Sequence, residues 1–178
     1  MKSYLCLLRG INVSGKNIIK MAELSELMRQ EGLQAVKTYI QSGNIVFKSE
    51  IEEADILEEK ISSAIKLKFG YEVPALVVDY QSFSTIVALN PFVGELDIKN
   101  LHVTILKETP KPELLNTITN TIGDDSFQII GCAIYLNCPN GYGNTKLTNT
   151  FFEKKLKQKA TTRNWKTCLE LLEMLKNI

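Results

Sequence analysis

A glycine-containing loop near the start of the chain carries groups that bind anions. The stretch LLRGINVSGKN, residues 7–17, ends an apolar run at Arg9 and continues through Gly15 and Lys16. Backbone N–H groups next to glycine, together with an arginine and a lysine, suit phosphate oxygens. The spacing resembles a P-loop, but Asn17 stands where that motif has serine or threonine. Two hypotheses stay open: an anion-binding loop, and a turn that joins a strand to a helix.

A second glycine loop, GYGNTKLTN, covers residues 141–149 and opens an expected helix. Asn144 or Thr145 is the candidate cap of that helix. Lys146 would then lie in the first turn, where the helix dipole disfavours a cation unless an anion is also bound. The loop is therefore interpreted either as a helix start or as a second binding loop.

The stretch ATTRNW, residues 160–165, gathers two hydroxyls, an arginine, an amide and the single tryptophan. One interpretation is the end of a strand followed by a helix cap at Asn164, with Trp165 in the core. In the other interpretation, Arg163 binds a phosphate or carboxylate through two parallel hydrogen bonds.

A fourth polar stretch, QSGN at residues 41–44, separates two β-rich runs. It is typical of a hairpin with a two-residue loop at Ser42 and Gly43, since glycine accepts the positive φ of such turns. In a ferredoxin-like sheet the third strand lies antiparallel beside the first. The end of the first strand and the start of the third then share one edge. We therefore expect six residues to meet there: Arg9, Asn12, Lys16, Gln41, Ser42 and Asn44.

Several kinds of chemistry have no signature in this chain. His102 is the only histidine and has no Cys, Asp or Glu at ligand spacing, so it is interpreted as structural. Neither a serine–histidine–acid nor a cysteine–histidine arrangement is present, and no metal cluster is expected. We expect no cofactor. The donors named above support electrostatic stabilisation, and whether the chain catalyses a reaction stays open.

Composition and charge indicate an ordinary globular protein. The 178 residues are 44% hydrophobic and carry a formal net charge of +1, which gives no global case for a nucleic-acid or membrane partner. Residues 144–166 nevertheless hold seven bases and one acid, either as a solvated face or as a surface for an anionic partner. The four cysteines form no C-x-x-C pair and predict buried thiols. With no signal-peptide pattern or membrane-length apolar run, the expected location is the cytoplasm.

The order of expected elements repeats in the two halves. Strand-like runs lie at 4–8, 36–40, 45–47 and 74–78, and again at 101–106, 127–130, 133–137 and 160–163. Helical spacing covers 21–28, 54–68, a segment capped by Thr109, 147–156 and 165–175. The chain is thus predicted to be α+β, with two tandem ferredoxin-like (βαββαβ) subdomains, antiparallel sheets and a C-terminal helix. The expected division is 1–89, a linker at 90–97, and 98–178.

The motifs together resemble a known family. LLRGINVSGKN, MAELSELM, TYIQSGNIVF, NPF and the segments GYGNTKLTNTFFEKKL and ATTRNW are similar, in order, to domain-of-unknown-function family 1697, which consists of small bacterial proteins. The resemblance implies a two-subdomain α+β fold and no established activity. The family pattern that the resemblance implies has glycine where this chain has Ser14, and proline where it has Lys20. The chain departs from the pattern at these two positions.

The leading hypothesis is a protein that binds, or acts on, a phosphate-bearing small molecule or nucleotide. The alternatives are an RNA-binding module, which residues 144–166 favour but the scarcity of stacking aromatics does not, and a protein-interaction module. The candidate ligand-binding residues are Arg9, Asn12, Lys16, Gln41, Ser42, Asn44, Lys146, Thr148, Arg163 and Asn164.

Overall fold

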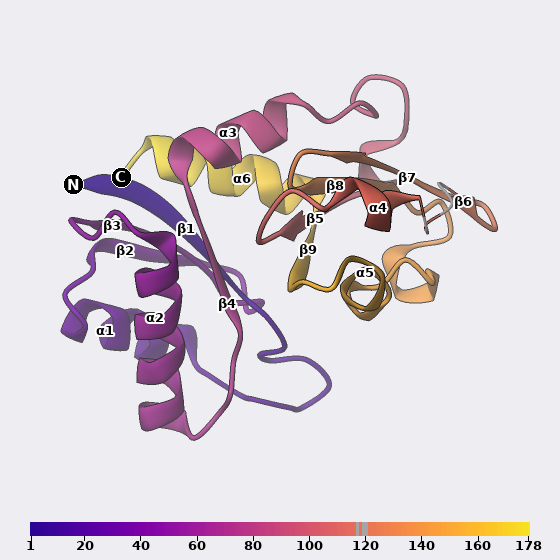
Figure 1. Ribbon diagram of the computed structural model, residues 1–178. Coiled ribbons are helices and arrows are strands. Elements are labelled where there is room, and N and C mark those ends of the chain that lie inside the picture. Colours follow the sequence, from indigo (N-terminus) through magenta and orange to yellow (C-terminus); the bar gives the residue numbers. More distant parts are fainter. Residues whose placement is uncertain (117, 119–120) are drawn as a thin grey trace. The chain divides into compact units, whose positions relative to one another are not determined.

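The computed structural model describes residues 1–116, 118 and 121–178. By its internal contacts the chain forms two compact units (Figure 1). The first unit contains Met1–Thr85 and Glu170–Ile178, and the second contains Ile86–Leu169. The final residues of the chain thus group with the first unit, whereas the sequence placed them with the second half. The expected linker at 90–97 lies inside the second unit.

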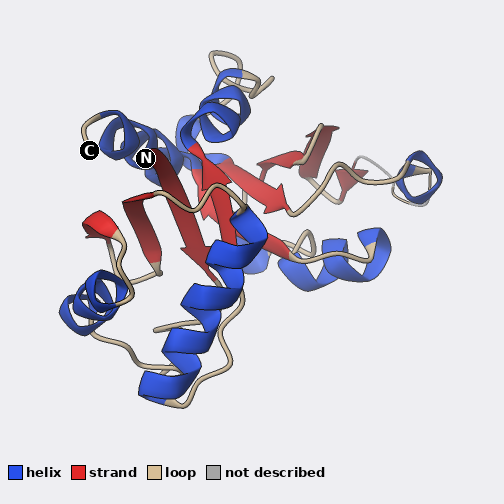
Figure 2. Cartoon of the chain, turned by 60° about the vertical axis from the view of Figure 1, so that its left-hand side comes forward, coloured by secondary structure: helices blue, strands red, loops and turns tan. Residues whose placement is uncertain are grey.

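The first unit is an antiparallel sheet with helices. Its strands are β1 (Lys2–Leu8), β2 (Gln34–Tyr39), β3 (Asn44–Ser49) and β4 (Ala75–Asp79), hydrogen-bonded in the order β2-β3-β1-β4. Two helices lie entirely within this unit, α1 (Met21–Gln30) and α2 (Ala54–Phe69). Two more, α3 (Tyr80–Ala88) and α6 (Trp165–Lys176), lie partly in this unit and partly in the second. Figure 2 draws the strands of both units in red and the helices in blue. Every pairing of these strands is antiparallel, and β1 lies between β3 and β4.

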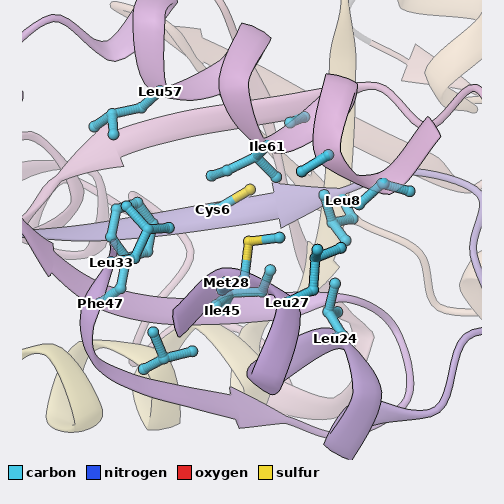
Figure 3. Close-up of a cluster of buried hydrophobic side chains, with 14 of the residues drawn as sticks. Cys6, Leu8, Leu24, Leu27, Met28, Leu33, Ile45, Phe47, Leu57 and Ile61 are labelled. Carbon is cyan, nitrogen blue, oxygen red and sulfur yellow. The ribbon is translucent and has the colours of Figure 1, made fainter. Parts of the chain in front are cut away.

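Alternation along the strands builds the core of the first unit. Cys6 and Leu8 from β1, and Ile45 and Phe47 from β3, lie on one face of the sheet because strand side chains alternate between faces. Side chains from α1 and α2 pack against that face, and Met28 is fully buried among them (Figure 3). This packing fixes the end of β1 beside the start of β3, where Leu7 pairs with Asn44.

The second unit repeats the order of elements around another antiparallel sheet. Its elements are η1 (Ile98–Asn100), β5 (Leu101–Leu106), α4 (Pro112–Leu115), β6 (Thr121–Ile122), β7 (Asp125–Ile130), β8 (Ala133–Asn137), η2 (Tyr142–Asn144), α5 (Asn149–Leu156) and β9 (Ala160–Asn164). The strand order is β6-β7-β8-β5-β9. Leu106, Phe127 and Phe152 are among the residues that form its core on one face of the sheet.

Two expectations about helices were wrong. The helix expected to begin after a Thr109 cap is only the four-residue α4, and its N-cap is Lys111. Proline at 110 and at 112 explains the late start, because proline excludes the residue before it from the helical region. The helix α3, where Phe83 and Ile86 are buried, was not expected. None of the helices in the described residues combines the length and apolarity that a bilayer span requires.

The two hairpins differ in their loops. At 131–132 the loop has two residues, since Ile130 pairs with Ala133, as the sequence predicted. The loop between β2 and β3 has four residues rather than the expected two, because Tyr39 pairs with Asn44. Gly43 does not close a turn across this hairpin. Its carbonyl instead accepts a hydrogen bond from the N–H of Leu8, at 2.8 Å.

Candidate functional site

Asn12 holds the first glycine loop in place. Its Nδ2 donates to the carbonyl of Ile19 and to the carbonyl of Gln41, each at 2.9 Å. Its Oδ1 accepts from the N–H of Ile19, also at 2.9 Å. One amide side chain therefore closes the loop on itself and ties it to the hairpin between β2 and β3. The loop and the hairpin therefore meet as the sequence predicted, and the side chain of Asn12 makes the contact between them.

The backbone at this end of the first unit is unusually strained. Six non-glycine residues have a positive φ in the described part of the chain, and four of them lie here: Asn12, Ser14, Asn17 and Ile40. A left-handed conformation costs a non-glycine residue about 1–3 kcal/mol, most for β-branched residues such as Ile40. The fold must supply this energy elsewhere, and strain of this kind clusters at functional sites.

Gly43 brings the hairpin against the loop. Its φ is +75°, and a Cβ there would lie 2.7 Å from Leu8 Cβ and 2.8 Å from Ile11 Cδ1. Only glycine fits such a position. The neighbouring polar groups are also used inside the structure, since Nδ2 of the fully buried Asn44 donates to the Tyr39 carbonyl and to Ser42 Oγ, both at 3.0 Å. Ser42 and Asn44 thus shape the hairpin.

The other three of the six predicted residues differ in their exposure. Arg9 is half-buried just after β1, and its backbone N–H donates to the carbonyl of Pro74 at 3.0 Å. Lys16 and Gln41 are exposed. Ser14 and Gly15, beside Lys16, are exposed as well, and their N–H groups donate to no partner within the described residues. We call the surface formed by Arg9, Lys16, Gln41 and these two N–H groups the loop site.

The second glycine loop is held by threonines. Thr145 Oγ1 donates to the Asp125 carboxylate at 2.5 Å and accepts from the N–H of Leu147 at 3.0 Å. Thr148 is the N-cap of α5, where its Oγ1 accepts from the N–H of Phe151 at 3.2 Å. Lys146 lies between them and is exposed. The cap expected at Asn144 or Thr145 is therefore Thr148, and Lys146 precedes the helix.

The predicted residues of ATTRNW point in different directions. Asn164 caps α6, since its Oδ1 accepts from the N–H of Thr167 at 2.8 Å. Thr162 Oγ1 donates to Asn149 Oδ1 at 2.7 Å and therefore faces α5. Arg163 lies between them in the strand, so its side chain leaves from the opposite face of the sheet. The structure does not bring Arg163 together with Thr148 and Asn164 on one face.

Sequence reasoning missed a ring pair in the second unit. The rings of His102 and Tyr142 stack with centroids 4.8 Å apart and planes 23° apart. Nδ1 of His102 lies 3.1 Å from the carbonyl oxygen of Asn100. Burial lowers the pKa of His102, so its imidazole is neutral near pH 7. Forty residues separate the two rings, and the spacing in the sequence carries no sign of their contact.

Thiol and metal chemistry find little support in the described residues. All four cysteines are free, and burial raises the pKa of Cys138 to about 11 and that of Cys168 to about 12. Both thiols are therefore protonated near pH 7 and are poor nucleophiles. The described residues contain no group of three His, Cys, Asp or Glu side chains placed to hold a metal ion.

Two hollows lie away from the predicted residues. One, of about 650 Å³, is lined in the first unit by Lys2, Asp79, Tyr80 and Leu175 among others. The other, of about 320 Å³, lies beside α4 in the second unit. None of the ten predicted ligand-binding residues lines either hollow. Neither of these two hollows therefore belongs to the loop site.

Comparison with known proteins agrees with the fold. Residues 1–135 match the family described as protein of unknown function (DUF1697). A solved structure, that of the conserved bacterial protein SP0830 from Streptococcus pneumoniae, is similar with a TM-score of 0.77 and 25% sequence identity. The similarity covers 98% of each chain. A search of curated proteins found no match.

Proposed function

The chain belongs to the DUF1697 family, and we propose that it binds a phosphate-bearing small molecule or nucleotide at the loop site of the first unit. The observation that carries this proposal is the concentration of left-handed residues around one exposed loop. Four non-glycine residues with a positive φ lie in this loop and in the neighbouring hairpin: Asn12, Ser14, Asn17 and Ile40. Turn formation alone does not need them, because glycine adopts the same φ at no steric cost.

The chemistry of the loop site suits a phosphate group. Lys16 supplies an exposed ammonium, and the N–H groups of Ser14 and Gly15 are oriented by a loop that Asn12 clamps. Backbone N–H groups beside a cation are the common donors to phosphate oxygens. Arg9 adds a guanidinium, which is suited to two parallel hydrogen bonds. Because the clamp holds these donors before a ligand arrives, binding costs less ordering entropy.

The second candidate, RNA binding, has less support. An RNA-recognition sheet presents aromatic rings on its open face for stacking with bases. In the first unit, Phe47 is buried and stacks on Tyr4 with ring centroids 5.8 Å apart, on the face that the helices cover. RNA binding therefore rests only on the basic stretch at 144–166 and stays a prediction.

We further infer that each unit is a ferredoxin-like domain. The order β2-β3-β1-β4 with antiparallel neighbours supports this for the first unit. In the second unit β7, β8, β5 and β9 take the equivalent places, and β6 is an additional edge strand. A cytoplasmic location belongs to the same inference and is supported by four free cysteines.

Thermal unfolding with phosphate probes tests the proposed function. The probes are inorganic phosphate, pyrophosphate, ribose 5-phosphate, AMP and ATP, at constant ionic strength. A probe at about 100 times its Kd should stabilise the protein by about 2.7 kcal/mol. We expect Lys16→Gln to weaken the binding of that probe about tenfold, which is equivalent to about 1.4 kcal/mol for one charge-assisted contact.

Lys37→Gln is the matched control. Lys37 is an exposed lysine of the same unit, on β2, and has no salt bridge in the described residues. The control should bind the probe as the wild type does. The proposal is wrong if no probe raises Tm, or if Lys37→Gln and Lys16→Gln weaken binding equally, since that result means unspecific attraction to surface charge.

A further inference from the structure

His102 and Asn164 are direct neighbours on one face of the second sheet. The register of β5 and β9 pairs His102 with Asn164 and Thr104 with Thr162. Directly opposed residues of an antiparallel pair project from the same face, with Cβ atoms about 5 Å apart. The hydroxyls of Thr104 and Thr162 confirm the shared face, because their Oγ1 atoms lie 2.6 Å apart. A polar strip thus crosses the two strands.

The imidazole of His102 presents a hydrogen-bond acceptor. The oxygen of Asn100 that faces Nδ1 belongs to a carbonyl, which only accepts, so Nδ1 carries the proton. Nε2 is then unprotonated and acts as an acceptor. Within the described residues, Nε2 has no hydrogen-bond partner. His102 is half-buried rather than fully buried, and the inference requires Nε2 to lie on the accessible part of the ring.

Asn164 presents a donor next to that acceptor. Its Oδ1 is used as the cap of α6, which fixes how the amide is turned. Its Nδ2 donates to no group in the part of the chain that the structure describes, and the residue is exposed. The carbonyl of Asn100 and the helix cap therefore orient an imidazole acceptor and an amide donor on two directly opposed residues of β5 and β9.

Tyr142 fixes the plane of the imidazole. Its ring stacks on that of His102, and it is the first residue of η2. The loop that follows is tied to β7 through Thr145 and Asp125. Aromatic stacking and a rigid loop together restrict the rotamers of His102, which lowers the entropy lost when a ligand binds.

From these contacts we infer that His102 and Asn164 bind a planar ligand with an N–H donor beside an acceptor, as in a carboxamide or the edge of a nucleobase. The ligand's N–H donates to His102 Nε2, and its carbonyl oxygen or ring nitrogen accepts from Asn164 Nδ2. The arrangement is that of an amide paired with another amide, in which each side gives one donor and one acceptor. The proposed site contains no residue of the loop site, so its test does not depend on whether the protein binds phosphate.

The single histidine makes a direct NMR test possible. In protein labelled with ¹⁵N at histidine, we expect the Nδ1–H tautomer and a titration midpoint below the ordinary histidine pKa, because the ring is partly buried. Nicotinamide is the first probe, and methyl nicotinate is its control, since the ester has a similar shape but no N–H donor. Adenosine and cytidine are the nucleobase probes.

Binding of nicotinamide should shift the His102 ring signals in a saturable way, and methyl nicotinate should bind at least about tenfold more weakly. Sites that hydrogen-bond a ligand reject analogues that lack the donor. The inference is overturned if no amide probe gives a saturable shift up to its solubility limit. It is also overturned if the ester binds as well as the amide, or if the Nε2–H tautomer predominates.

Asn164→Ser is the decisive variant. Serine caps helices as well as asparagine does, so α6 and the stability of the fold should persist, and only the Nδ2 donor is removed. Calorimetry should show nicotinamide binding about tenfold more weakly to Asn164→Ser. Asn177→Ser, which changes an exposed asparagine near the end of the chain, should bind as the wild type. Equal affinity for Asn164→Ser and wild type would contradict the inference.

Discussion

Two glycine loops that look alike in the sequence are stabilised by different means. The loop at 10–17 is held by two amide side chains, those of Asn12 and Asn17, and Asn17 Nδ2 donates to the Gly10 carbonyl at 2.9 Å. Its left-handed backbone is one that glycine and asparagine tolerate. The loop at 141–148 is held by threonine hydroxyls, which bond to Asp125 and cap α5. In the first loop the side chains donate to backbone carbonyls, whereas in the second Thr145 donates to the side chain of Asp125 on β7.

The difference decides which groups remain available for a ligand. In the first loop the clamp uses Asn12, while Lys16 and the N–H groups of Ser14 and Gly15 face solvent. In the second loop the threonine caps use the N–H groups of Leu147 and Phe151. Two glycine loops that each carry a lysine can therefore differ in the groups that they offer to a ligand. The first loop offers charge and backbone donors, and the second positions Tyr142 against His102.

Replacing the hairpin glycines gives the largest expected contrast. Gly43→Ala should lower the free energy of unfolding by about 3 kcal/mol, because the new Cβ meets Leu8 and Ile11 at a left-handed φ. Gly131→Ala, in the two-residue hairpin, meets nothing within 4 Å and should cost only about 1 kcal/mol, from its φ of +58° alone. Urea unfolding measures both changes. Equal losses would show that the close approach of Gly43 to β1 has no energetic weight.

Removing the two clamps gives a smaller contrast. Asn12→Ala deletes three hydrogen bonds of 2.9 Å and should cost about 2 kcal/mol. It should also abolish phosphate binding at the loop site, since the loop loses its tie to Gln41. Thr145→Val leaves the buried Asp125 carboxylate without its hydroxyl donor and should also cost about 2 kcal/mol.

Phosphate affinity separates these two variants. Calorimetry with the best phosphate probe should show binding lost for Asn12→Ala and retained for Thr145→Val. If both variants bind the phosphate probe with the same affinity, the clamp of Asn12 has no specific role in phosphate binding, and the proposed difference between the two loops is wrong.

The strand layout was open to prediction because it rests on local patterns. Alternation and the β-rich runs placed β1 beside β3, and the contact between Asn12 and Gln41 follows from that topology. The use of each polar side chain was not open to prediction. Asn12, Ser42 and Asn44 looked like ligand donors, yet Asn12 and Asn44 donate to backbone carbonyls and Asn44 also donates to Ser42, which depends on loop conformation.

The helices and the single histidine show the same limit. The helix α3, in which Phe83 and Ile86 are buried three residues apart, was not predicted. His102 was expected to be structural because no ligand-type residue lies near it in the sequence. Its register opposite Asn164 and its contact with Tyr142 are tertiary facts, and no local pattern encodes them.

The smallest expected effect concerns the strain of the first loop alone. Ser14 has a φ of +50°, at a position where the family resemblance implies glycine. Ser14→Gly should raise the free energy of unfolding by about 0.5 kcal/mol, because relief of the left-handed strain slightly exceeds the added entropy of the unfolded chain.

Ser63→Gly, in the middle of α2, is the control and should have the opposite sign. It should lower the free energy of unfolding by about 0.5–1 kcal/mol, because glycine is a poor helix former. Differential scanning calorimetry resolves the two signs. A loss of stability for Ser14→Gly would mean that the serine at this position contributes more than its left-handed φ costs, and that backbone strain does not limit the stability of this loop.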